Sequence, residues 1–143
     1  MKEEALFDAG SILELVRRLK AGAPPVLSEG STLSLAFYEV GNAIWKQCHL
    51  QGRLDAREGA GLLSTLVAII GAMDVVTPDS EESAGRALEL ANRLRLTYYD
   101  ASYLAEAKNS GKTLVTDDAQ LLQAARKAGV RSMTSEAFQG SLA

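Results

Sequence analysis

The fold of this chain is decided by residues 96–118, which read LTYYDASYLAEAKNSGKTLVTDD. Thr97 is a favourable N-cap for a helix that continues to about Asn109 and ends at Gly111. Residues 113–116 read as a buried strand, and residues 118–128 read as a second helix. This order of helix, short strand and helix is typical of a parallel sheet that is covered on both faces.

The same alternation continues through the rest of the chain. Further short strands are expected at residues 5–7, 26–27, 74–77 and 130–133, separated by helices over 12–19, 34–50, 55–73 and 83–94. A length of 143 residues with 47% apolar content suits one domain with a real core. We therefore expect an α/β fold in a single domain over residues 1–143, a three-layer α/β/α sandwich with a short-stranded, mainly parallel central sheet.

Composition excludes several kinds of site. Cys48 and His49 are the only cysteine and histidine, which argues against a zinc site and against a Ser-His-Asp or Cys-His device. The longest uncharged stretch, residues 59–73, is shorter than the ~20 apolar residues that a bilayer span needs. Since the N-terminus also lacks the apolar core of a secretory signal, we expect no membrane association and a cytoplasmic protein.

Carboxylates recur beside apolar segments, and they are Asp8, Glu39, Asp100, Asp117 and Asp118. Asp8 ends the first expected strand and the Asp pair ends the strand at 113–116, so they share one edge of the sheet if these strands are neighbours. Glu39 lies on the border of the apolar sector of its helix. An oxygen-only set of this kind suits Mg²⁺ or Mn²⁺, which predicts metal-dependent chemistry on phosphates.

Each carboxylate also has a purely structural interpretation. Asp100 follows Thr97 in the pattern of a helix cap, and the Asp pair lies where the helix macrodipole favours negative charge. Glu39 alone is typical of a surface residue. The functional interpretation depends on all of them occurring in this order, at places that one edge of the sheet requires.

These segments resemble the PIN domain family, and within it the VapC-like ribonucleases of toxin–antitoxin pairs. The resemblance covers nearly the whole chain, and its most specific part is the stretch from Leu96 to Leu104. It implies that the metal ligands and catalytic residues are Asp8, Glu39, Asp100 and Asp118. It further implies that Ser11, Asn42 and Thr116 donate hydrogen bonds to these ligands or to phosphate and that Asp117 lies beside the ligands, and it favours Asp118 over Asp117 as the ligand because the family's last Asp lies two residues after the Thr.

The resemblance implies a Mg²⁺- or Mn²⁺-dependent endoribonuclease that acts on single-stranded or structured RNA. It also implies a homodimer and an antitoxin protein that covers the cleft. The alternatives are a non-catalytic module that binds RNA or protein, and a housekeeping nuclease for RNA processing. A phosphorylated receiver domain fits less well because Thr77 and Pro78 follow the middle strand, and a haloacid-dehalogenase-type phosphatase needs a second Asp where Gly10 stands.

Overall fold

Five parallel strands form the centre of the molecule, in a computed structural model that describes residues 4–142. Their order across the sheet is β3-β2-β1-β4-β5, and every neighbouring pair is parallel. The strands are β1 (Ala5–Phe7), β2 (Ser31–Leu33), β3 (Asp74–Val76), β4 (Thr113–Val115) and β5 (Ser132–Met133). Residues 1–3 and 143 of the expected single domain lie outside the described residues.

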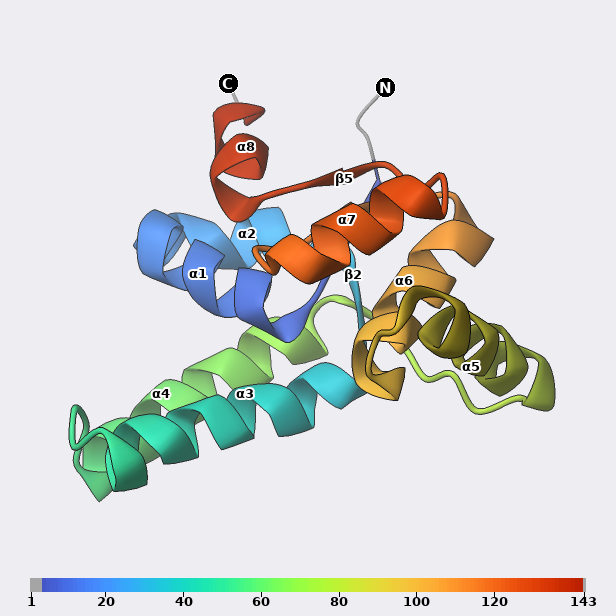
Figure 1. The fold of residues 1–143 in the computed structure, drawn as a ribbon. Coiled ribbons are helices and arrows are strands. Elements are labelled where there is room, and N and C mark those ends of the chain that lie inside the picture. The colour runs from blue at the N-terminus through green and yellow to red at the C-terminus, as the bar shows by residue number, and fades with distance from the viewer. Residues whose placement is uncertain (1–3, 143) are drawn as a thin grey trace.

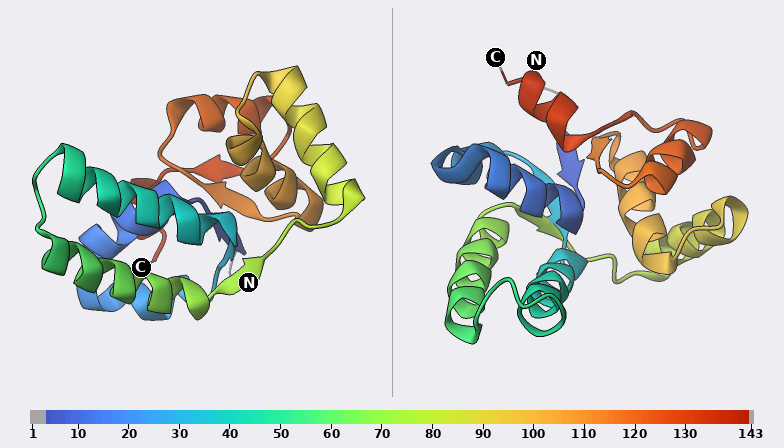
Figure 2. Two further views of the ribbon diagram at one scale, coloured as in Figure 1. Left: turned by 90° about the horizontal axis from the view of Figure 1, so that it is seen from below. Right: turned by 60° about the vertical axis from the view of Figure 1, so that its left-hand side comes forward.

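Helices cover both faces of this sheet, so the fold is the expected three-layer α/β/α sandwich (Figures 1 and 2). They are α1 (Ala9–Leu19), α2 (Ala23–Leu27), α3 (Leu35–Trp45), α4 (Ala56–Gly71), α5 (Glu81–Leu94), α6 (Tyr98–Ser110), α7 (Ala119–Lys127) and α8 (Ser135–Gly140). A 3₁₀ turn, Lys20–Gly22, joins α1 to α2, and a π-helical turn, Lys46–Leu50, extends α3. No helix within residues 4–142 is both long enough and apolar enough to cross a membrane.

Two separate cores explain why such short strands are stable. Successive side chains of a strand point to opposite faces, so Leu6 packs with α5, α6 and α7 while Phe7 packs with α1 to α4. The neighbouring strand divides in the same way, with Leu114 in the first core and Val115 in the second. All four side chains are buried, as expected for a sheet covered on both faces.

One expected strand was wrong. Residues 26–27 lie in α2, which begins at Ala23 and carries Pro24 and Pro25 in its first turn. Proline is tolerated there because the first amides of a helix have no intrahelical partner, so the two prolines begin a helix instead of ending one. The second strand follows at Ser31–Leu33, a segment that was not predicted to be a strand. The last helix, α8, was not predicted.

The chain reverses its direction across the sheet between β1 and β4. It runs from β1 to β2 and β3 on one side, then crosses to β4 and β5 on the other side of β1. Helices α1 and α7, which follow β1 and β4, therefore leave on opposite faces and open a crevice at the carboxyl ends of these strands. Asp8 and the pair Asp117–Asp118 directly follow those two strands.

Gly30 allows the chain to pass closely over Phe7 before it enters β2. A Cβ added to Gly30 would lie 2.4 Å from Cε2 of Phe7, whose ring is also fixed edge-on against Phe138 of α8 at a centroid distance of 5.0 Å. We expect Gly30→Ala to lower the free energy of unfolding by about 1–3 kcal/mol, the usual cost of overpacking. Urea denaturation measures the change, and Gly61→Ala in α4, where the added Cβ meets open space, is the control. Equal destabilisation of the two variants would contradict this explanation.

Candidate active site

An acidic cleft of about 590 Å³ lies at the crevice between β1 and β4. Its lining includes all four carboxylates expected to act together, each from a different element. They are Asp8 after β1, Glu39 in α3, Asp100 in the first turn of α6 and Asp118 before α7. The expectation that these side chains face one space at the edge of the sheet is therefore met.

Asp8 is held in place by the start of α1. Its Oδ1 accepts a hydrogen bond from the amide of Ser11 at 2.9 Å, which caps the helix, and its Oδ2 accepts one from the hydroxyl of Thr116. Burial raises the pKa of the Asp8 carboxyl, and the hydrogen bonds from Thr116 and Ser11 offset part of that rise. The charge of Asp117 raises this pKa further.

Glu39 is fixed by a tyrosine that lies one helical turn after Asp100. The hydroxyl of Tyr103 donates to Oε1 of Glu39 at 2.7 Å, and the Tyr103 side chain is fully buried. Burial raises the pKa of Glu39, the hydrogen bond lowers it, and the charges of Asp100 and Asp8 raise it again. Burial also raises the pKa of Tyr103 well above its usual value, so this hydroxyl remains a donor at all physiological pH values.

Asp100 lies where the N-terminus of α6 meets the cleft. Its amide donates to Oγ1 of Thr97 at 3.1 Å, so Thr97 caps the helix, but the reciprocal bond of a full capping box is not formed. Burial raises the pKa of Asp100, and the charges of Asp118 and Asp8 add to the rise. Two unit charges about 4 Å apart repel by roughly 4 kcal/mol at an effective dielectric of 20, so this proximity has a real cost.

The two residues of the Asp pair have different partners. Both oxygens of Asp117 are engaged by Ser135 at the start of α8, its amide at 2.8 Å and its hydroxyl at 2.6 Å. Asp118 uses Oδ1 to cap α7 through the amide of Leu121 at 2.9 Å. Asp117 therefore attaches α8 to the edge of the sheet, whereas no described residue engages the second oxygen of Asp118.

Of the four expected supporting residues, two bond to Asp8, whereas Asp117 bonds to Ser135 and Asn42 lies in solvent. Thr116 and Ser11 are buried and bond to Asp8, and the hydroxyl of Ser11 donates to the Asp8 carbonyl oxygen at 3.0 Å. Asn42 is exposed and lies outside the lining of the cleft. Sequence reasoning missed the role of Tyr103, although its position three residues after Asp100 places both on one side of α6.

The cleft carries a strong excess of negative charge. Besides the carboxylates already described, Glu14 and Glu136 line it, and Arg18 is the cation in its lining. Arg18 donates to Glu14 at 2.8 Å, which with Arg17 lowers the pKa of Glu14 to about 2. Within residues 4–142, no lysine or arginine forms an ion pair with any of the four expected ligands.

These residues fit a hard divalent cation by their chemistry, since they are clustered, partly buried oxygen donors that form no ion pair with a lysine or arginine of the described chain. Among the described residues, no three acidic, histidine or cysteine side chains lie close enough together to form a preformed metal site. The carboxylates of Asp8 and Asp118 instead accept hydrogen bonds from helix amides, and that of Glu39 accepts one from Tyr103. Mg²⁺ commonly keeps several waters, so a few direct ligands satisfy it.

Comparison with known proteins agrees with this arrangement. The family model of the PIN domain matches residues 5–127, which include all the expected ligands. The chain belongs to the PIN domain family. As a PIN domain, it has its acidic cleft at the edge of a parallel sheet, as the resemblance of its motifs predicted.

Two curated relatives come from Pyrobaculum aerophilum. Exonuclease VapC9 is 38% identical over 90 residues, which span 63% of this chain and 62% of the relative. Ribonuclease VapC3 is 37% identical over 92 residues, which span 64% of this chain and 68% of the relative. The match thus covers a little under two thirds of the length of VapC9.

Solved structures have the same fold over nearly the full chain. PAE2754 from Pyrobaculum aerophilum superposes with a TM-score of 0.77 at 29% identity and covers 96% of this chain and 95% of its own. A VapBC complex bound to DNA, from Salmonella typhimurium, gives a TM-score of 0.67 at 14% identity, covering 94% and 99% of the two chains. At 14% identity, the similarity to the Salmonella typhimurium protein shows only that the two chains share a fold.

Proposed function

We propose that this PIN domain is a divalent-metal-dependent endoribonuclease that hydrolyses phosphodiester bonds of RNA. The observation that carries the proposal is the cluster of Asp8, Glu39, Asp100 and Asp118 in one cleft, where no lysine or arginine of residues 4–142 forms an ion pair with them. Burial and mutual repulsion raise the pKa values of three of them, a cost that a structural site has no reason to retain. The relatives VapC9, an exonuclease, and VapC3, a ribonuclease, support nuclease activity.

Asp8, Glu39, Asp100 and Asp118 would hold Mg²⁺ or Mn²⁺. When bound, the cation lowers the pKa of a coordinated water and stabilises negative charge on the phosphoryl oxygens. Thr116 and Tyr103 orient the carboxylates of Asp8 and Glu39 by the hydrogen bonds described above. Asp117 keeps α8 at the mouth of the cleft through Ser135, and thereby positions Glu136 and Thr134 in its lining.

The biological role proposed here is that of the toxin in a toxin–antitoxin pair. It is supported by the names of the two VapC relatives and by a structural neighbour from Klebsiella pneumoniae that is a toxin–antitoxin complex, with a TM-score of 0.62 at 19% identity. In this role the protein would act in the cytoplasm as a homodimer, and an antitoxin protein would inhibit it.

Cleavage of RNA with controlled metal tests the proposal. We expect the purified protein to cut single-stranded RNA internally in Mg²⁺ or Mn²⁺ and to stop in excess chelator, with activity restored by either ion. Fragments that are cut from circular RNA identify internal cleavage, because a circle offers no end to an exonuclease. Cleavage that persists in chelator, or that needs a free end, would contradict the proposal.

Expression in cells tests the toxin role separately. Induction of the protein alone should slow growth, and co-expression of the small protein encoded beside it should restore growth. Normal growth at a level of expression where extracts show nuclease activity would instead indicate RNA processing.

A further inference from the structure

A second groove, of about 400 Å³, lies between α5 and α6 and outside the acidic cleft. Its charged lining is mostly basic, with Arg86 and Arg93 from α5 and Lys108 from α6 against a single acid, Glu89. All three cations are exposed, and within residues 4–142 none of them forms an ion pair. The groove therefore presents unbalanced positive charge, the opposite of the cleft.

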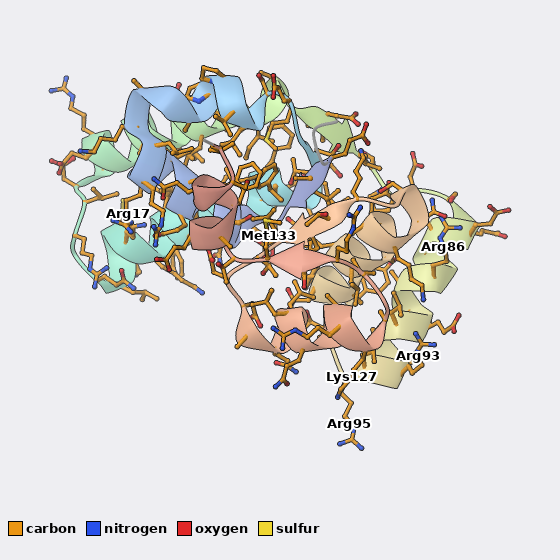
Figure 3. All side chains as sticks on the ribbon, turned by 90° about the horizontal axis from the view of Figure 1, so that it is seen from above. Arg17, Arg86, Arg93, Arg95, Lys127 and Met133 are labelled. Carbon is orange, nitrogen blue, oxygen red and sulfur yellow. The ribbon has the colours of Figure 1, made fainter. Side chains whose placement is uncertain are left out.

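Arg95 directly follows α5 and contacts the start of α7 through its backbone. Its carbonyl accepts a hydrogen bond at 3.2 Å from Nε2 of Gln120, which lies in the first turn of α7, two residues after Asp118. Its side chain is exposed, and in Figure 3 it extends outward beyond the end of α5, whereas Arg86 and Arg93 lie along that helix. Arg95 thus adds a further exposed cation at the end of α5, in the segment that leads to α6 and Asp100.

The backbone of Arg95 makes this residue an unusual choice. It ends α5 in the left-handed conformation, with φ 56° and ψ 44°, where glycine is the favoured residue because it has no Cβ. An arginine at this position has a backbone cost that glycine would avoid, and its side chain remains exposed to solvent. The guanidinium group can donate several hydrogen bonds to an anion such as phosphate.

Two tyrosines lie between Arg95 and Asp100. Tyr98 and Tyr99 in the first turn of α6 are 43% and 60% exposed, which leaves their rings accessible to solvent. Proteins that bind single strands combine a basic groove along the backbone with aromatic rings on which bases stack. Asp100 and Lys108 are about 12 Å apart along α6 at 1.5 Å per residue, so a few nucleotides span the distance.

We propose that the groove between α5 and α6 is a binding site for single-stranded RNA that flanks the cleaved bond. Arg95, Arg93, Arg86 and Lys108 bind its phosphates, and Tyr98 or Tyr99 stacks on a base next to the cleft. The acidic cleft repels a polyanion, so the affinity for RNA comes from this basic surface, and the cleft supplies the chemistry. The site rests on the proposed ribonuclease function for its substrate class.

Binding without metal isolates the groove from the chemistry. The probe is a fluorescent 12-nucleotide oligouridylate in excess chelator, and the variants are Arg86→Ala/Arg93→Ala and Arg95→Gly. For a single strand, each phosphate contact adds about 0.7 to the salt exponent, the steepness with which log K falls as log[salt] rises, and this corresponds to roughly fivefold in affinity at 0.1 M salt. We expect a loss of about 25-fold and a fall of about 1.4 in the exponent for the double variant, and about fivefold for Arg95→Gly.

The controls exclude changes in folding and in total charge. Arg95→Gly should unfold at the same temperature as the wild type or a higher one, because glycine relieves the left-handed backbone. Arg53→Ala/Arg57→Ala removes two exposed charges near the start of α4, at the far end of the molecule from α5, and should bind as the wild type does. Unchanged RNA affinity in both groove variants, or equal loss in this control, would overturn the proposal.

Failure of the groove and failure of the nuclease give different results. If the wild type binds the oligouridylate, the groove variants do not, and the wild type fails to cleave RNA in Mg²⁺ or Mn²⁺, the groove is an RNA-binding site but the ribonuclease function is contradicted. Normal cleavage and binding by the groove variants would overturn only the groove. A wild type that binds an acidic peptide but not the oligouridylate in chelator would also overturn it.

Discussion

Asp8→Asn and Asp100→Asn should each lower kcat/KM for RNA cleavage by about 10³-fold or more while the protein remains folded. A metal ion contributes several kcal/mol of transition-state stabilisation, and each 1.36 kcal/mol lost lowers the rate about tenfold. Asparagine keeps the shape of the side chain and removes its charge, and it caps a helix as well as aspartate does. The amide of Ser11 therefore still finds an acceptor at residue 8, and α1 should remain capped.

The neighbouring acids provide a matched control. Asp118→Asn keeps the cap of α7 and should lose activity as Asp100→Asn does. Asp117→Ala removes both acceptors of the buried Ser135, which should cost about 1–3 kcal/mol of stability and leave most activity at a temperature where the variant is folded. Cleavage assays and urea denaturation on the same preparations separate the two effects. Loss of activity in Asp117→Ala with retention in Asp118→Asn would reverse the assignment.

The parts of the fold that were predictable are those fixed by local chemistry. Helix α6 begins at the N-cap Thr97 and ends at Gly111, and α7 begins at the N-cap Asp118. Each of these caps bonds to a group only three or four residues away, so local sequence is enough to predict it. Asp8 likewise caps α1 as it leaves β1. Because the caps lie at the carboxyl ends of strands, the same local signals that begin the helices also place carboxylates at one edge of the sheet.

Contacts between distant segments were not predictable in this way. The bond between Tyr103 and Glu39 joins residues 64 positions apart, and it depends on how α3 and α6 meet at the edge of the sheet. Asn42 is the opposite case, a contact that was predicted but is not formed. Helical spacing places it one turn after Glu39, but in the folded protein its side chain is exposed to solvent. The strand predicted at 26–27 was wrong because two consecutive prolines can either end a helix or begin one. In this protein they begin α2, and β2 starts only after it.

Mg²⁺ or Mn²⁺ should stabilise the folded protein, whether or not RNA is present. A ligand that binds only the native state at 100 times its Kd adds about 2.7 kcal/mol, which for a domain of this size is an increase in Tm of roughly 5–10 °C. The increase should vanish in Asp8→Asn and Asp100→Asn, and it should remain in Asn42→Ala, whose side chain lies outside the cleft. Thermal unfolding at increasing metal concentration measures it, and an equal increase in all variants would indicate a metal site elsewhere.

The dependence of this effect on pH follows from the raised pKa values of Asp8, Glu39 and Asp100. Their pKa values in the folded protein lie above the unfolded values near 3.8 and 4.5. At any pH between the unfolded and the folded pKa values, the folded protein therefore binds more protons than the unfolded chain, and its stability increases as the pH falls through this range. The metal-free protein should therefore become less stable as pH rises through the folded values, and Asp100→Asn should lose part of that dependence. Bound metal requires the ionised carboxylates, so its stabilisation should grow over the same window. A metal-induced increase in Tm that is independent of pH would show that these carboxylates do not bind the ion.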